Sequence, residues 1–195
     1  MTIDLIKKSF AAGILIALGC CISMIAENPV IGAFLFSIGL VSVRIFKLYL
    51  FTGKTQDIIS GDIEWWRLLI ILVFNILGAQ FIMLLFWIGN HGLMAIRAIA
   101  ATKMARPWYT LLCCGIGCGA LMTLATHKDS PLWLSIMCVM GFILAGFEHS
   151  IADGFYLTAI GPVIWVQWQF WTIVAGNFLG GIGMAYFIKQ NKTSP

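Results

Sequence analysis

The sequence predicts an all-α integral membrane protein with roughly six transmembrane helices. Of its 195 residues, 61% are hydrophobic and only 10% are charged, and the mean hydropathy is +0.96. These values lie far outside the range of a soluble globular domain. Because a membrane-spanning helix needs about 20 apolar residues, six spans joined by short loops account for the whole length. We therefore expect a single membrane domain over residues 1–195.

Six apolar segments are separated by polar or proline-containing breaks. They run over Ser9–Ala26, Pro29–Phe51, Trp65–Gly89, Pro107–Thr126, Pro131–Ile160 and Pro162–Ile188. Four of them begin with proline, which suits the first turn of a helix because the N–H that proline lacks has no partner there. The basic pair Lys7-Lys8 resembles the start of a signal peptide, but no convincing small-residue cleavage site follows. We expect the first segment to be retained as a helix.

Two of the segments carry ionisable residues in their interior. The second contains Arg44 and Lys47 before Leu50-Phe51-Thr52-Gly53, and the fifth contains Glu148-His149 and Asp153. An acid inside the membrane costs roughly 2.5–3.5 kcal/mol on insertion scales, so such residues usually have a function. Irregular backbone at this depth is tolerated only where it lines a cavity or is covered by protein. We expect both helices to break near the midplane.

The two halves of the chain show an internal repeat. The spacing from Pro29 to Asn75 equals that from Pro131 to Asn177, with a common shift of 102 residues. The same shift carries Gly13-Ile14 onto Gly115-Ile116, and it carries Lys47 onto His149. Three spans per half reverse the direction of the second half, so we expect inverted repeats over about residues 5–90 and 107–190. Such repeats with broken helices are typical of transporters and channels.

The charges predict an orientation with both termini in the cytoplasm. The basic residues on the cytoplasmic side would be Lys7, Lys8, Lys54, Arg67, Lys128, Lys189 and Lys192, and those outside would be Arg97, Lys103 and Arg106. The positive-inside rule favours this orientation, because more basic residues lie on the cytoplasmic side. The net charge of +4 therefore concerns membrane topology and does not indicate nucleic-acid binding. The six cysteines lie in apolar runs without metal-type spacing. We expect no metal and no cofactor.

The fifth-segment motif Gly146-Phe147-Glu148-His149-Ser150-Ile151-Ala152 resembles the signature of the formate/nitrite transporter family. Further matches are Leu50-Phe51-Thr52-Gly53, Lys103 and Gly176-Asn177-Phe178-Leu179-Gly180-Gly181, so the resemblance spans nearly the whole chain. It implies an aquaporin-like six-helix fold and a homopentamer in the inner membrane with one pore per protomer. It also implies transport of small monovalent anions such as formate, nitrite or hydrosulfide, often with a proton.

The resemblance assigns roles to individual residues. His149 becomes the central pore histidine, Thr52 the threonine of the broken second segment and Asn177 a polar partner near the centre. Lys103 would draw anions toward the vestibule. The constrictions would be formed by Phe36 with Phe142 and by Leu40 with Phe51. Five residues depart from the family pattern, namely Arg44, Lys47, Tyr49, Gly119 and Asp153, so the resemblance does not settle the substrate.

The chemistry of such a pore favours a proton-assisted passage. An anion crossing an apolar constriction pays a large desolvation penalty, whereas its neutral acid pays far less. Histidine exchanges a proton near neutral pH, so we expect His149 to lend a proton while Thr52 donates a hydrogen bond. Neighbouring helical residues point about 100° apart, so we expect Glu148 to face away from the pore, toward Lys103 or backbone N–H groups. We expect Asp153 to pair with Lys47 or Arg44.

Other classes of protein are less compatible with the sequence. An intramembrane protease would need a serine–histidine dyad, but Ser150 and His149 are adjacent and diverge on a helix, and no Gly-x-Ser-x-Gly turn exists. We therefore expect no enzyme. A metal-ion transporter using Glu148, His149 and Asp153 would face repulsion from Lys47. A channel for a small neutral solute such as water or urea remains the other alternative.

Overall fold

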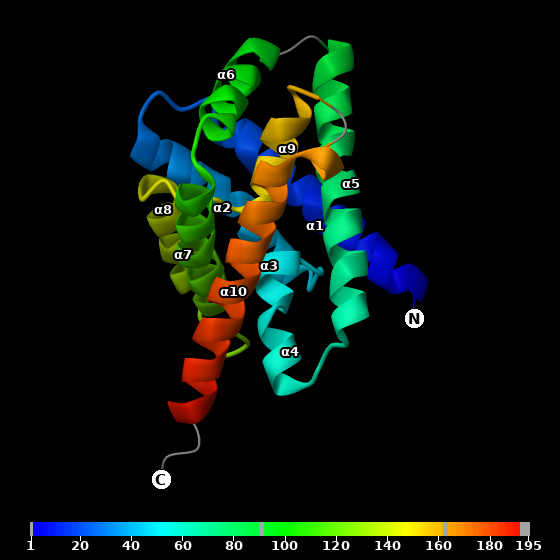
Figure 1. Ribbon diagram of the computed structural model, residues 1–195, viewed down its shortest axis with the longest axis vertical. Coiled ribbons are helices and arrows are strands. Elements are labelled where there is room, and N and C mark those ends of the chain that lie inside the picture. The colour runs from blue at the N-terminus through cyan, green and yellow to red at the C-terminus, as the bar shows by residue number, and fades with distance from the viewer. Residues whose placement is uncertain (1, 90–91, 162–163, 192–195) are drawn as a thin grey trace.

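The computed structural model describes residues 2–89, 92–161 and 164–191, and these are helical with short connections. The helices are α1 (Thr2–Ser23), α2 (Pro29–Ile45), α3 (Phe51–Lys54), α4 (Gln56–Ser60), α5 (Trp65–Gly89), α6 (Leu93–Met104), α7 (Trp108–Thr126), α8 (Leu132–Leu144), α9 (Ser150–Thr158) and α10 (Trp168–Asn191), with a 3₁₀ turn at Ile164–Val166 (Figure 1). Pro162 and Lys192, which figured in the predictions, lie outside the described residues.

Among the residues that the structure describes, four helices are long and apolar enough to cross a membrane: α1, α5, α7 and α10. The apolar helices α2 and α8 are shorter, with 17 and 13 residues, because the segments that contain them are interrupted. Helix α1 begins seven residues before the predicted start at Ser9, and the ion pair of Lys8 with Asp4 (3.0 Å) spans one turn of this added part. Helices α4 and α6 lie in connections for which the sequence predicted no helix.

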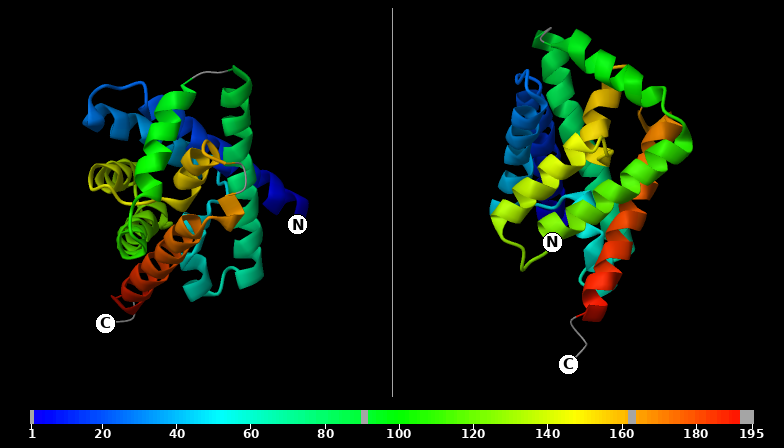
Figure 2. Two further views of the ribbon diagram at one scale, coloured as in Figure 1. Left: turned by 45° about the horizontal axis from the view of Figure 1, so that its top comes forward. Right: turned by 90° about the vertical axis from the view of Figure 1, so that its left-hand side faces the viewer.

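The helices form two groups that enclose the short helices α3 and α9. In one group α1 packs on α5 and α2, and in the other α7 packs on α10 and α8. The groups meet where α2 lies against α8, which the left-hand view of Figure 2 shows side by side. Between them, α3 contacts α5, α7 and α10, while α9 contacts α1, α5, α6 and α10. The two short helices therefore occupy the centre of the molecule.

Glycines allow the long helices of each group to approach closely. A Cβ atom on Gly13 of α1 would lie 1.9 Å from the carbonyl oxygen of Asn75 in α5. The matching contact in the other group joins α7 and α10, where a Cβ on Gly119 would lie 2.2 Å from the carbonyl oxygen of Asn177. Any side chain at either position would force the backbones apart.

These contacts correct the sequence alignment of the two halves. Because Gly13 and Gly119 make the same contact, α1 corresponds to α7 with a shift of 106 residues (13 to 119). The predicted match of Gly13 with Gly115 is therefore displaced by four residues, about one helical turn. Asn75 and Asn177 keep the predicted shift of 102. A single offset fails because the connections between the helices differ in length.

Candidate functional site

Both interruptions begin with the same backbone motif. At the end of α2, the Leu48 N–H donates to the Val43 carbonyl (2.9 Å) and the Lys47 N–H donates to the Arg44 carbonyl (3.1 Å). In α8 the corresponding bonds run from Phe147 to Phe142 (2.9 Å) and from Gly146 to Ile143 (3.0 Å). This pattern is a Schellman motif, which ends a helix with one residue in the left-handed region. That residue is Lys47 (φ 52°) in the first half and Gly146 (φ 69°) in the second.

The motif shows that Lys47 does not correspond to His149, as the sequence suggested. Lys47 corresponds to Gly146, a shift of 99 residues, and its side chain is exposed. The residue in the place of His149 is Leu50, since each precedes the first residue of the following short helix. The predicted pair of nitrogen bases is therefore wrong. A lysine in the left-handed region is also uncommon, because its Cβ crowds the backbone.

His149 is buried at the start of α9 with a defined proton arrangement. Its Nδ1 accepts a hydrogen bond from the Ala152 N–H (3.2 Å). An amide can only donate, so Nδ1 carries no proton and the neutral ring must carry its proton on Nε2. Nε2 lies 3.0 Å from the Thr52 Oγ1. His149 thus donates to Thr52, and the threonine hydroxyl keeps its own proton for another acceptor.

Thr52 reaches this contact from the other half of the chain. It is the second residue of α3 and is fully buried. The hydrogen bond between Thr52 and His149 therefore joins the two short helices that follow the interruptions. Both residues were assigned to the site from the sequence, and the structure brings them together.

An asparagine from a long helix holds each interruption in place. The side chain of Asn177 in α10 donates to the carbonyls of Glu148 (2.8 Å) and Gly115 (2.9 Å) and accepts from the Ser150 N–H (2.8 Å). It thus binds the backbone on both sides of His149. Asn177 was expected near the pore, and it acts here on the backbone that positions the histidine.

Asn75 in α5 makes the corresponding bonds in the first half. It donates to the carbonyls of Tyr49 (2.8 Å) and Ser9 (2.7 Å) and accepts from the Phe51 N–H (2.8 Å). Sequence analysis used Asn75 only to align the repeat and did not include it in the site. The shared pattern Asn-x-x-Gly in α5 and α10 was the signal that could have identified it.

Four charged side chains form a cluster next to His149. Glu148 Oε1 lies 2.7 Å from Arg106 Nη1, and its Oε2 contacts Lys103 Nζ. Lys103 Nζ also lies 2.7 Å from Asp153 Oδ1. Burial disfavours the charged form of Lys103, but the carboxylates of Asp153 and Glu148 outweigh it and raise the pKa of this lysine above its usual value. Lys103 therefore carries its charge at neutral pH.

This cluster corrects the predicted partners of Asp153. Asp153 pairs with Lys103 and not with Lys47 or Arg44. Glu148 does face Lys103, one of the donors named for it, and it has a second partner, Arg106, that sequence analysis did not include. Lys103 is at the end of α6 and Arg106 follows it, in a connection where no helix was predicted. The approach of α6 to α9 was therefore not visible in the sequence.

Arg44 has a separate structural position. Its guanidinium donates to Ser135 Oγ (2.5 Å), to the Ser130 carbonyl (2.6 Å) and, at 3.4 Å, to the carbonyls of His127 and Pro131. These groups lie in the connection between α7 and α8 and in the first turns of α8. Arg44 thus ties α2 to this connection.

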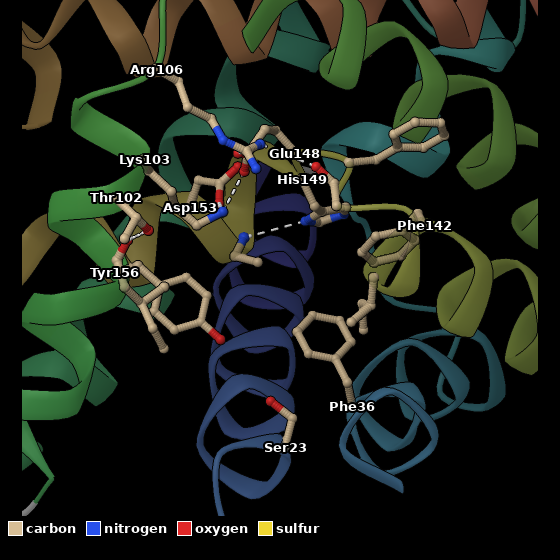
Figure 3. A pocket seen from close by; sticks show the side chains of 15 residues that line it. Ser23, Phe36, Thr102, Lys103, Arg106, Phe142, Glu148, His149, Asp153 and Tyr156 are labelled. Atoms are coloured by element: carbon tan, nitrogen blue, oxygen red, sulfur yellow. Dashed lines mark hydrogen bonds and ion pairs between the residues drawn. The ribbon is translucent and has the colours of Figure 1, made fainter. Parts of the chain in front are cut away.

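A cavity of about 260 Å³ opens beside the cluster. Its lining combines charged, aromatic and apolar side chains, and Figure 3 shows the charged cluster near His149, with Phe36 and Phe142 across the cavity from Lys103. The Phe36 and Phe142 rings meet edge to face, with centroids 5.9 Å apart, and Phe142 stacks on His149 at 5.7 Å. The other two residues named for a constriction, Leu40 and Phe51, are buried in the hydrophobic core and do not line this cavity.

Within the described ranges, no group of three or more His, Cys, Asp or Glu side chains is arranged to hold a metal ion. The charged groups beside His149 are instead paired with one another, as the distances above show.

The fold and the buried site define a membrane transport protein with two interrupted segments at its centre. The chain belongs to the formate/nitrite transporter family, whose model, described as "Formate/nitrite transporter", matches residues 1–190. Its relatives are channels and transporters, so it is a transport protein and not an enzyme.

Curated relatives are similar at moderate identity. The uncharacterized transporter YrhG of Bacillus subtilis is 28% identical over 97% of this chain and 86% of its own length. The nitrite transporter NirC of Salmonella typhimurium is 26% identical over 95% of this chain and 83% of its own length. The formate channel FocA of Escherichia coli K12 is 28% identical, but the match covers 74% of this chain and only 58% of FocA.

Solved structures share the fold. A pentameric formate channel with formate bound superposes with a TM-score of 0.77 over 96% of both chains at 21% identity. An FNT family ion channel gives a TM-score of 0.76 over 98% of this chain and 89% of that chain at 22% identity. At this identity the likeness establishes the fold alone.

Proposed function

We propose that this protein conducts a small monovalent anion, namely formate, nitrite or hydrosulfide, and that His149 lends the anion a proton in the pore. The observation that carries the proposal is the buried contact between His149 and Thr52, which joins the two central short helices. The cavity beside it is lined by Lys103 and Arg106 together with Glu148 and Asp153. Because the two cations balance the two acids, the lining has no excess of negative charge that would favour a metal ion.

The first step is the approach of the anion to an apolar barrier. The anion reaches the cavity and meets the rings of Phe36 and Phe142, which leave little room for its hydration shell. Losing that shell costs an anion far more than it costs the corresponding neutral acid. A hydrogen bond from the Thr52 hydroxyl offsets part of this cost, because its proton is not used by His149.

The second step is the transfer of a proton from His149. When the ring carries two protons, its Nδ1–H faces the Ala152 N–H, and the hydrogen bond between them is lost. The doubly protonated ring is therefore a ready donor. It gives one proton to the anion, returning to the neutral ring, and the neutral acid crosses the aromatic barrier. If the acid releases its proton on the far side, the neutral ring takes up a new proton from solution on the entry side, so one proton crosses with each anion. If the proton returns to the ring instead, the anion crosses without net proton transfer.

We further propose an assembly and a topology for the chain. Residues 1–195 would form one membrane domain of two inverted halves with six spans, in the inner membrane with both termini in the cytoplasm. The equivalent contacts of Asn75 and Asn177 support the relation between the halves. Five copies would form a homopentamer embedded in lipid, each with its own pore, by analogy with the pentameric formate channel.

Flux measurements in proteoliposomes test the proposal. The wild type should take up formate, nitrite or hydrosulfide, and His149→Phe should lose the acceleration of anion flux at acidic pH. The matched control is His127→Phe, because His127 lies in the connection after α7 and is not among the residues that line the cavity. Unchanged flux in His149→Phe at every pH refutes the proton step. Faster passage of urea or of a metal ion than of any anion refutes the anion assignment.

A further inference from the structure

Asp153 is the least well paired member of the charged cluster. It is buried, with its side chain 2% exposed, and its Oδ1 contacts Lys103. Its Oδ2 has no hydrogen-bond partner among the residues that the structure describes. A buried carboxylate oxygen without a donor is costly, and protonation is the usual way to remove that cost.

Glu148 is held far more firmly than Asp153. Glu148 receives Arg106 on one oxygen and Lys103 on the other, so each of its oxygens faces a full positive charge. Asp153 pairs with Lys103 alone, and Lys103 is paired with Glu148 as well. A proton that reaches the cluster will therefore settle on Asp153, and the unpaired Oδ2 offers it a place.

The charge of the cluster depends on that proton. With both acids ionised, the cations of Lys103 and Arg106 balance the charges of Glu148 and Asp153, and the cluster is neutral. With Asp153 protonated, the cluster carries one positive charge next to the cavity. Since a change of one unit charge within a few ångströms is felt strongly in a partly buried site, the attraction for an anion should rise with that proton.

We propose that Asp153 makes anion binding in the cavity dependent on a proton. When Asp153 is protonated, it no longer neutralises the positive charge of Lys103, and that charge becomes available to the anion. The inference rests on the proposed function and deepens it, because it places a second proton-binding group, Asp153, beside the cavity in addition to His149.

Other groups that face Asp153 must be separated from its effect. They are Lys103, on α6, and Arg106, which follows it; Glu148 and His149, which precede α9; Tyr156 on α9; Cys20 on α1; and Cys118 on α7. Of these, His149 is the one that ordinarily titrates between about pH 5 and 8. The test is therefore made in a background that lacks it.

The test compares His149→Phe with the double variant His149→Phe/Asp153→Asn. The probe is nitrate, the anion of a strong acid, and its binding to the purified full chain is measured by calorimetry at about pH 5 and pH 8. The His149→Phe variant should bind nitrate about tenfold more tightly at the acidic pH. The double variant should bind at the tighter value at both pH values, because asparagine still accepts from Lys103 but carries no charge.

Three results overturn the inference. They are an equal pH dependence in both variants, weaker nitrate binding after Asp153→Asn, and no nitrate binding to His149→Phe at the acidic pH. A second measurement avoids dependence on the folding of the double variant. The infrared band of protonated carboxyls should grow between about pH 8 and pH 5 in the wild type, and this growth should be smaller by one carboxyl in Asp153→Asn alone; equal growth in the two proteins contradicts the inference.

This test and the flux test fail separately. Absence of formate, nitrite and hydrosulfide flux in the wild type would remove the proposed function while leaving the titration of Asp153 measurable. Normal anion flux together with pH-independent nitrate binding would remove only the role of Asp153.

Discussion

Replacing Asn177 with alanine should destabilise the protein and disable the site at once. The side chain makes three buried hydrogen bonds of 2.8–2.9 Å. Loss of the side chain leaves the Ser150 N–H and the Glu148 carbonyl without their partner in a buried place. An unsatisfied buried group costs about 1–3 kcal/mol, although interhelical hydrogen bonds in membrane proteins average only about 0.6 kcal/mol. We expect a loss of about 2–4 kcal/mol in the free energy of unfolding.

The assay is unfolding by a denaturing detergent in mixed micelles, followed by formate flux in proteoliposomes. Asn75→Ala should show a similar loss of stability, because Asn75 makes the corresponding three bonds. The matched control is Thr172→Ala on the same helix as Asn177, where only a bond to the Trp168 carbonyl of the preceding turn is lost (2.9 Å); its effect should stay within about 0.5 kcal/mol.

The result that refutes this reasoning is an Asn177→Ala protein whose stability lies within about 0.5 kcal/mol of the wild type and whose flux is normal. Such a protein would show that the interruption before α9 holds its shape without the asparagine. Lost flux with wild-type stability would instead place Asn177 in contact with the anion and not in support of the backbone.

Two further predictions concern packing and the tether at Arg44. Gly180→Ala should cost about 1–3 kcal/mol, because its Cβ would lie 2.0 Å from the Ile116 carbonyl oxygen, whereas Gly183→Ala, with nothing within 4 Å, should be neutral or stabilising by up to about 1 kcal/mol. The same unfolding assay measures both, and equal effects would contradict the close contact. Arg44→Lys should loosen the connection between α7 and α8, since a lysine cannot reproduce the spread of the four guanidinium bonds. Amide hydrogen exchange at residues 127–130 should become faster, and an unchanged rate would show that the tether is dispensable.

The sequence was sufficient to predict the helical class, the two interrupted segments and the two residues, His149 and Thr52, that meet at the centre. Hydropathy and proline positions marked the segments because both respond to local chemistry. His149 and Thr52 were found because a polar residue in an apolar run is rare and the surrounding motif resembles a known family. Both kinds of signal are carried by short stretches of chain, so neither needs the packing of distant helices.

The predictions that failed depended on register between distant segments. One offset of 102 residues matched Asn75 with Asn177, but the structure requires 106 between Gly13 and Gly119. Connections of unequal length change the offset without leaving a local signal. The partner of Asp153 was wrong for a related reason: the unpredicted helix α6 brings Lys103 to it.

The corrected register also changes how the centre of the molecule is understood. The two halves hold their interruptions with the same asparagine contacts and the same helix-ending motif, so the scaffold is nearly symmetric. The residues that precede the short helices differ, with Leu50 in one half and His149 in the other. Leu50 makes no side-chain capping bond and cannot carry a proton. His149 caps α9 through its Nδ1, and its ring can carry a proton. In the mechanism proposed above, the proton must therefore pass on the α9 side, where Asp153 and Lys103 also lie, while the α3 side contributes the Thr52 hydroxyl.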